Sequence, residues 1–433
     1  MKSFLLILPI IFIFSTCNSD NKNSYSPKVR IVKSEGKYIL YRDGKPFTIK
    51  GAAGYSHFSE LRKSGGNAIR IWDTLHLATI LDSAWANNLA VIVGLPIPDN
   101  KDYMIYYDNP DKVASQLKAY KTIVNTFKAH PAVLMWCVGN ELTFPYGPAY
   151  NNFYKAFNEL VEMIHQDDPD HPVTTTILNF NEKYIFNLSV RCRIDLISFN
   201  IFSLINKLRD DLTTFSWFWD GPYLLTEWGV DGPWSGTEQT AWGAYIENTS
   251  TKKAEIVLNR YRQFIPVDDP RFLGAFVFFW GQKQETTPTW FSLFDETGAR
   301  SELVNAMHTI WTRKPALYQV PAVKYMLVDQ KGARDNILLN PNQPVSAEVL
   351  MESLADTIQA VKWQIFKEDW YAETYRNAPA KPTPLSLFTA QSRLKATFVA
   401  PSKEGPYRLF ATIYNHNGSY ATCNTPFYVV GKP

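Results

Sequence analysis

The chain has 433 residues, too many for one ordinary domain, and its 45% apolar residues can supply two large cores. The 44 basic and 41 acidic residues nearly balance, and the basic ones do not cluster. Nucleic acid is therefore excluded as an expected partner.

Residues 1–17, MKSFLLILPIIFIFSTC, have the composition of a signal segment, with one lysine before an apolar run. The run is too short to remain as a membrane-spanning helix. The segment resembles a bacterial lipoprotein signal, which implies lipidation of Cys17 and an outer-membrane location facing the periplasm or the cell surface. Phe14 and Thr16 depart from the usual residues of such signals, so cleavage by an ordinary signal peptidase is the alternative. Residues 18–27 are polar and predict a flexible linker.

Three cysteines follow, Cys137, Cys192 and Cys423, and their spacing predicts neither a disulfide framework nor a zinc site. Cys137 and Cys192 sit in apolar runs and are expected to be core residues. No His/Asp/Glu cluster has the spacing of a catalytic metal site, so we expect no metal or other cofactor.

Residues 28–314 alternate between strand and helix patterns. The stretch 37–51, KYILYRDGKPFTIKG, predicts a hairpin that turns at Asp43-Gly44. Near-continuous apolar strands alternating with amphipathic helices then predict a parallel sheet buried on both faces, and eight such units favour a (β/α)8 TIM barrel. No glycine-rich phosphate-binding loop follows these strands, which excludes the common nucleotide-binding motifs. The expected strands are 47–50, 68–72, 90–95, 133–139, 173–177, 194–199, 223–226 and 274–280.

Residues 315–433 lose the helical period. Short β runs, such as AVKWQIFK and YRLFATIYN, are separated by turn signals such as NPNQP and NHNGS. This pattern predicts a small all-β domain, an immunoglobulin-like sandwich.

Two of the barrel strands end in a glutamate. The fourth, in WCVGNELTFP, ends in Asn140-Glu141, and the seventh, in LLTEWGV, ends in Glu227. In a TIM barrel these strand ends share one face, where we expect both carboxylates to point into one cleft from roughly opposite sides. Paired carboxylates suit glycosidic bond hydrolysis, in which one donates a proton and the other attacks or stabilises the sugar. The alternative is that each glutamate is an unrelated loop charge or helix cap.

The two motifs, W-x-V-G-N-E and T-E-W-G, resemble those of clan A of the glycoside hydrolases, which are retaining (β/α)8 enzymes. The resemblance implies that Glu141 is the acid/base and Glu227 the nucleophile. It further implies that Asn140 binds the sugar 2-hydroxyl, and that Arg70, in NAIRIW at the end of the second strand, supports the nucleophile.

The sixth strand departs from the clan's pattern, which usually has a tyrosine or histidine contacting the nucleophile there. Here the segment is DLISFNIFSL, with Asn200 and Phe202 in that position. Either Asn200 takes over the polar contact, or a tyrosine such as Tyr55 arrives from elsewhere.

Further residues near the strand ends are candidates for substrate binding, because sugar rings stack on aromatic side chains. Trp280, after the eighth strand, resembles the clan's floor of the −1 subsite. For Trp72 and Trp228, packing in the core or behind the site is at least as well supported. Other candidates are Gln282, Gln284 and Trp290, which follow the eighth strand, and His57, after the first strand.

The layout of a compact barrel followed by one immunoglobulin-like domain resembles glycoside hydrolase family 158. That resemblance implies an endo-β-1,3-glucanase acting on laminarin-type polysaccharide, as a monomer. Family 2-like barrels and β-1,3-glucanosyltransferases share the motifs, and a non-catalytic glycan-binding lipoprotein is a further alternative. The C-terminal domain could bind glycan through Trp363, Trp370 and Tyr371, although Trp363 alternates with apolar neighbours, which favours a structural role.

Overall fold

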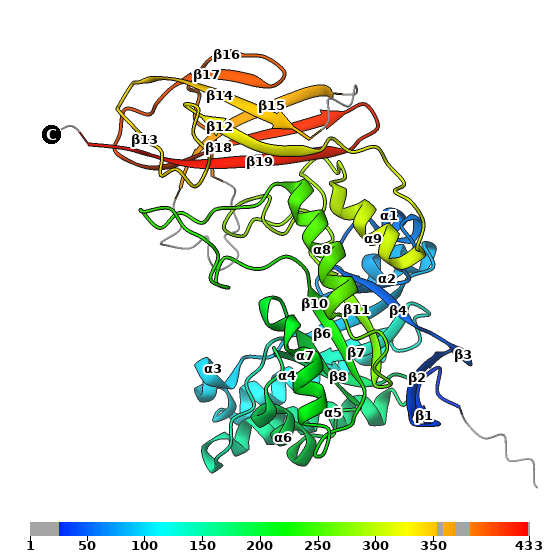
Figure 1. Cartoon of the computed structure of the whole chain (residues 1–433). Coiled ribbons are helices and arrows are strands. Elements are labelled where there is room, and N and C mark those ends of the chain that lie inside the picture. Colours follow the sequence, from blue (N-terminus) through cyan, green and yellow to red (C-terminus); the bar gives the residue numbers. More distant parts are fainter. Residues whose placement is uncertain (1–25, 353–357, 369–381, 432–433) are drawn as a thin grey trace, which may run out of the picture.

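The computed structural model describes residues 26–352, 358–368 and 382–431. The chain forms two parts, a barrel and a β-sandwich above it (Figure 1). The predicted signal segment 1–17 with Cys17, nearly all of the predicted linker, and Trp370 and Tyr371 lie outside the described residues. Among the residues that are described, no helix combines the length and apolar character needed to cross a membrane.

A small antiparallel sheet precedes the barrel. It consists of β1 (Val29–Ser34), β2 (Lys37–Arg42) and β3 (Lys45–Pro46). Asp43 (φ 50°) and Gly44 (φ 75°) both have positive φ, as a tight two-residue hairpin turn requires, so the predicted hairpin is confirmed. Backbone hydrogen bonds join this sheet to loops that lead into the barrel strands. The sheet therefore lies at the N-terminal end of the barrel strands, opposite the end that carries the glutamates.

The eight expected strands close into a parallel barrel in the order β10-β11-β4-β5-β6-β7-β8-β9, which confirms the predicted fold. The strands are β4 (Ile49–Ala53), β5 (Ala68–Arg70), β6 (Ala90–Leu95), β7 (Val133–Val138), β8 (Val173–Leu178), β9 (Leu196–Asn200), β10 (Tyr223–Trp228) and β11 (Phe272–Phe278). The helices are α1 (Phe58–Lys63), α2 (Leu77–Ala86), α3 (Asn100–Tyr107), α4 (Pro110–Phe127), α5 (Asn151–Asp167), α6 (Glu182–Arg191), α7 (Leu208–Thr214), α8 (Ser250–Phe264) and α9 (Glu302–Thr312), with 3-10 turns η1 (Pro148–Tyr150) and η2 (Ser203–Asn206).

Local sequence explains why the barrel strands are buried and where several of the helices begin. β6, β7 and β10 are buried at every position, as parallel strands covered on both sides require. α4 starts at an Asn109-Pro110 pair, in which the Asn109 side chain accepts a hydrogen bond from the amide of Lys112. Asn181 and Thr249 cap α6 and α8 in the same way.

The C-terminal part consists of two four-stranded sheets, β12-β14-β17-β16 and β13-β19-β18-β15. This arrangement matches the A-B-E-D and A′-G-F-C sheets of an immunoglobulin-like sandwich, which confirms the predicted class. Trp363 is 5% exposed in the core between the sheets, so it does not form a surface platform. The strands are β12 (Val323–Val328), β13 (Leu338–Leu339), β14 (Pro344–Met351), β15 (Ile358–Lys367), β16 (Phe388–Gln391), β17 (Lys395–Val399), β18 (Gly405–Asn415) and β19 (Tyr420–Val429).

The sandwich packs on the barrel beside the C-terminal ends of the barrel strands. The amide of Thr422 donates to Ser250 Oγ at the start of α8 (2.9 Å), and Tyr414 donates to Asp295 in the loop after β11 (2.6 Å). The N-terminal end of α8 and the loops after β10 and β11 therefore contact the sandwich (Figure 1). These are the loops in which a TIM barrel carries its active site.

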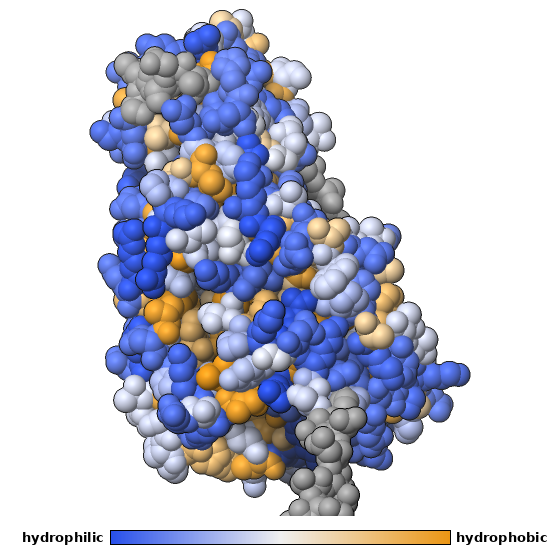
Figure 2. Space-filling view, turned by 90° about the vertical axis from the view of Figure 1, so that its right-hand side faces the viewer, coloured by the Kyte–Doolittle hydropathy of each residue, from blue (hydrophilic) through white to orange (hydrophobic). Residues whose placement is uncertain are grey.

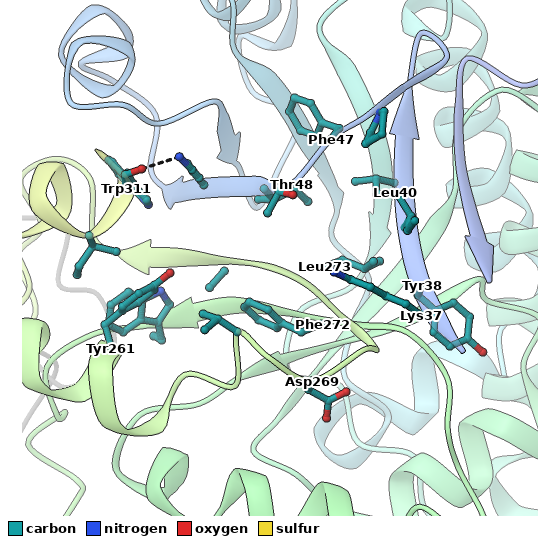
Figure 3. Close-up of a pocket in the computed structure, with 18 residues that line it drawn as sticks. Lys37, Tyr38, Leu40, Phe47, Thr48, Tyr261, Asp269, Phe272, Leu273 and Trp311 are labelled. Atoms are coloured by element: carbon teal, nitrogen blue, oxygen red, sulfur yellow. Dashed lines mark hydrogen bonds between the residues drawn. The ribbon is translucent and has the colours of Figure 1, made fainter. Parts of the chain in front are cut away.

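A groove of about 320 Å³ lies between the hairpin and the barrel wall. Figure 3 shows Lys37, Tyr38 and Leu40 of β2 facing Phe272 and Leu273 of β11 across it. These residues belong to the ends of the strands away from the glutamates, so this groove is not the predicted active site. In Figure 2, polar surface covers most of the sandwich, and apolar surface gathers on the barrel half of that face.

Candidate active site

Glu141 and Glu227 lie where the motifs predict them, at the C-terminal ends of β7 and β10. Glu227 is 5% exposed, and the next residue, Trp228, is buried against Tyr261 of α8. Alternation along β10 therefore directs Glu227 into the barrel and Trp228 outward. β7 and β10 are three strands apart around the eight-stranded barrel, whereas strands on opposite sides would be four apart. The two glutamates therefore lie on nearer strands than expected.

Arg70 connects the two motifs. Its side chain is 1% exposed at the end of β5, where it forms an ion pair with Glu227 and donates a hydrogen bond to Asn140 Oδ1. The contact that the resemblance implied for Arg70 is therefore present. Asn140 itself is exposed, which leaves it accessible to a ligand.

Asn200 of β9 contacts the acid/base candidate. Its Nδ2 donates to Glu141 Oε1 (2.9 Å) and to Asn140 Oδ1 (3.2 Å). Thr226 Oγ1 donates to Asn200 Oδ1 (3.0 Å), which fixes the orientation of the amide. Glu141 has a positive φ of 54°, so the chain turns sharply after β7 and brings this side chain beside Asn200.

The surroundings of Glu141 favour its protonated form. Burial, followed by the negative charge of Glu227, raises the pKa of Glu141 to about 7, although the Asn200 hydrogen bond and the Arg70 charge act in the opposite direction. A carboxyl group with this pKa still holds a proton near neutral pH, as a general acid must.

The sequence did not decide whether Trp72 contributes to the site or packs in the core. In the structure it contacts Glu227. Its Nε1 donates to Glu227 Oε1 (2.7 Å), and its ring lies 4.6 Å from the guanidinium carbon of Arg70. Tyr55 instead donates to Asp73 (2.7 Å) and accepts from the Trp72 amide (3.3 Å). Neither Asn200 nor Tyr55 thus supplies the expected polar contact to the Glu227 carboxylate. The indole of Trp72 supplies it, and Tyr55 holds the segment that carries Trp72.

The prediction that Trp280 floors a subsite is wrong. Its side chain is 0% exposed, and its Nε1 donates to the carbonyl of His57 (3.2 Å), so a sugar cannot stack on it. The ring of His57 stacks on Phe294 at 3.9 Å, and burial lowers the pKa of this histidine. The aromatic side chains next to Trp72 are instead Phe278 and Phe279, at ring distances of 5.8 and 5.7 Å.

Trp290 and Gln282 also differ from expectation. Trp290 is 4% exposed and donates to the carbonyl of Asp231 (2.9 Å), so it packs inside the loop rather than on a substrate. Gln282 is exposed and lines a crevice between barrel and sandwich together with Lys362. Gln284 lines a second such crevice.

Trp234, in the loop after β10, is an aromatic residue near the site that was not predicted from the sequence. It is 48% exposed and packs edge-on against Phe202 (6.5 Å), which in turn contacts Phe278 (5.8 Å). A continuous row of rings therefore runs from Trp72 beside Glu227 to an exposed indole. The signal in the sequence is an isolated tryptophan among turn-forming residues, DGPWSG, after the strand that carries Glu227.

Comparison with known proteins identifies the same barrel fold. Residues 79–287 match the family model described as glycosyl hydrolases family 2, TIM barrel domain, whereas no curated protein sequence matches. Among solved structures, the Faecalibacterium prausnitzii β-glucuronidase aligns with TM-score 0.50 and 17% identity over 67% of this chain and 53% of that one. The Dictyoglomus thermophilum β-D-glucuronidase aligns with TM-score 0.50 and 19% identity over 67% and 54%. The match thus spans about half the length of those chains, and at this identity it establishes a shared fold. The family match runs from residue 79 to residue 287, so it includes β6 to β11 and both Glu141 and Glu227.

Proposed function

We propose that this chain is a retaining β-glycoside hydrolase. The observation that carries the proposal is the pairing of Glu141 and Glu227: burial and the charge of Glu227 raise the pKa of Glu141, and Arg70 and Trp72 bind the carboxylate of Glu227. One carboxyl group is thereby prepared to donate a proton, and the other is fixed as a nucleophile.

In the first step, Glu227 attacks the anomeric carbon while Glu141 protonates the departing glycosidic oxygen. In the second step, Glu141, now ionised, removes a proton from water, which attacks the glycosyl-enzyme and releases Glu227. Asn140, held by Arg70 and Asn200, is placed to bind the sugar 2-hydroxyl beside the nucleophile.

For the substrate we propose an internal β-1,3 linkage of a laminarin-type glucan. The resemblance of the barrel-plus-immunoglobulin layout to family 158 supports this choice, and an exposed aromatic side chain such as Trp234 suits a polymer that extends beyond one sugar.

Anchoring of the protein to the outer membrane through Cys17 is part of the same proposal. Replacing Cys17 by Ser should move the protein from the membrane fraction to the soluble fraction.

Incubation with laminarin, followed by product sizing, tests the activity. Shorter products are expected; longer products would indicate transglycosylation, and no change would exclude this substrate. A panel of neutral and acidic β-glycans then locates the preferred linkage.

Two variants test the roles of the glutamates. Glu227→Ala should abolish turnover, and azide should restore part of it as the inverted glycosyl azide. Glu141→Ala should impair polysaccharide cleavage far more than cleavage of an aryl glycoside, because a good leaving group needs no proton. Near-normal polysaccharide cleavage by both variants would refute the proposal.

A further inference from the structure

The loop after β11 sends alternate side chains to opposite sides. Gln284 and Thr286 line the crevice toward the sandwich, together with Glu368. Lys283 and Glu285 are not part of that lining, and Glu285 is only 8% exposed. The Lys283 side chain lies on the barrel side of the loop, over the rings of Phe278 and Phe279, and Glu285 pairs with it.

Contacts of Lys283 locate this pair beside the catalytic centre. The Nζ of Lys283 lies 5.7 and 5.6 Å from the ring centres of Phe278 and Phe279, the two rings that pack on Trp72. The same Nζ lies 3.4 Å from Glu285 Oε2. Since Trp72 binds Glu227, the Glu285 carboxyl group lies at the edge of the catalytic cleft.

The electrostatic coupling agrees with that position. Burial raises the pKa of Glu285 against the opposing effect of Lys283, and the charge of Glu227 raises it further. Glu285 in turn contributes to the raised pKa of Glu141. A third carboxyl group is therefore close enough to influence both members of the catalytic pair.

The loop that carries Glu285 is firmly held. The hydroxyls of Thr287 and Thr289 donate to the buried carboxylate of Glu247 (2.7 and 2.8 Å), and Asn424 of the sandwich donates to the same carboxylate (2.7 Å). Backbone hydrogen bonds join Glu285 and Thr287 in both directions. Glu285 is therefore fixed in place by both domains.

We propose that Glu285 is a specificity-determining residue that restricts the cleft to neutral sugars and rejects uronic acids. Its carboxylate can accept hydrogen bonds from sugar hydroxyls, whereas a sugar carboxylate would be repelled by the negative charges of Glu285 and Glu227. The two cations at this position already have partners, since Arg70 is paired with Glu227 and Lys283 with Glu285. Like charges repel more strongly in a partly desolvated site than in bulk water. The inference rests on the proposed glycosidase function.

Laminarin and laminarin oxidised at C6 to the uronate form a matched neutral and anionic pair for the test. At low ionic strength, the wild-type protein should cleave the neutral polymer with a kcat/KM about a hundredfold higher. Glu285→Gln should reduce that ratio about tenfold, and Glu285→Asp, which keeps the charge, should largely preserve it. Melting temperatures verify that each variant is folded.

A pH profile supplies the second measurement. Removing the charge of Glu285 favours ionisation of Glu141, so the alkaline limb of kcat/KM on laminarin should move to lower pH by about half a unit. Glu296→Gln is the matched control, because Glu296 is on the same loop and pairs with Lys362 on the surface. Two results would overturn this inference but leave the proposed function standing. One is folded Glu285→Gln with the wild-type ratio of kcat/KM values and the wild-type alkaline limb of the pH profile. The other is fast cleavage of the oxidised polymer by the wild type. No cleavage of any β-glycan by the wild type would overturn the proposed function and the inference with it.

Discussion

Glu141 and Glu227 are the same residue type, and the groups around each one separate their roles. Glu227 accepts hydrogen bonds from Arg70 and Trp72, whereas Glu141 is half-buried with one amide donor, Asn200. The proton that the proposed mechanism needs on Glu141 is therefore retained because of its environment.

A pH dependence follows from this environment. Because the pKa of Glu141 is raised to about 7, its acid form declines as pH rises through that value. We expect kcat/KM on laminarin to fall above about pH 7, roughly tenfold per pH unit. Initial rates measured between pH 5 and 9 check this. A rate that stays flat to pH 9 would contradict the assignment of Glu141 as the acid.

Replacing Trp72 by Phe removes the indole N–H that binds Glu227, the proposed nucleophile, but keeps an aromatic ring against Phe279. Hydrogen bonds to charged groups contribute about 1.5–3 kcal/mol, so kcat should fall about ten- to a hundredfold, with a smaller change in KM. Trp228→Phe is the control, because the Trp228 indole N–H has no hydrogen-bond partner among the residues that the structure describes. Equal losses in the two variants would assign Trp72 a packing role only.

At the scale of elements, strands and their ends could be read from the sequence because buried parallel strands leave long apolar runs. The positions of Glu141, Glu227 and Arg70 could be predicted for the same reason, since each ends or closely follows such a run. Trp72 lies two residues beyond the end of β5, so its contact with Glu227 could not be predicted from alternation along the strand.

Residues beyond a strand end could not be located in this way. β11 ends at Phe278, two residues earlier than expected, so alternation no longer fixes the side on which Trp280 lies. Trp290 is likewise oriented by a long loop, in which its indole N–H bonds to the carbonyl of Asp231, a contact that has no sequence signature. Tertiary contacts decide such positions, and only the structure shows them.

The loop between β10 and α8 supplies Trp234, and its role can be tested with substrates of different length. We expect Trp234→Ala to raise KM for laminarin several-fold by removing a stacking surface, which contributes about 1 kcal/mol or more. Hydrolysis of a short aryl glycoside should change little, because that substrate does not extend along the row of rings. Equal effects on both substrates would indicate that Trp234 acts on the catalytic centre itself.

At the scale of the whole molecule, the barrel and the sandwich share one buried polar network. Glu247 of the barrel is 6% exposed and contacts Lys253, Thr287 and Thr289 of its own domain, and Asn424 of the sandwich. In the sandwich, the buried Arg408 donates to the carbonyl of Tyr245 (2.6 Å). The contacts that hold the two domains together therefore also hold the loop that enters the active site.

Replacing Glu247 by Ala tests this coupling, because it leaves the buried ammonium of Lys253 without its carboxylate and releases the loop and Asn424 together. Breaking a buried ion pair costs about 3–5 kcal/mol, so the free energy of unfolding should fall by about that amount in urea titrations. Lys362→Ala breaks an exposed interdomain pair with Glu296 and should cost at most about 1 kcal/mol. If both variants lost the same small amount, Glu247 would not be the main connection between the domains. A large loss confined to Glu247→Ala would instead show that the carboxylate that holds the Thr287 and Thr289 hydroxyls is also a main source of stability at the domain interface.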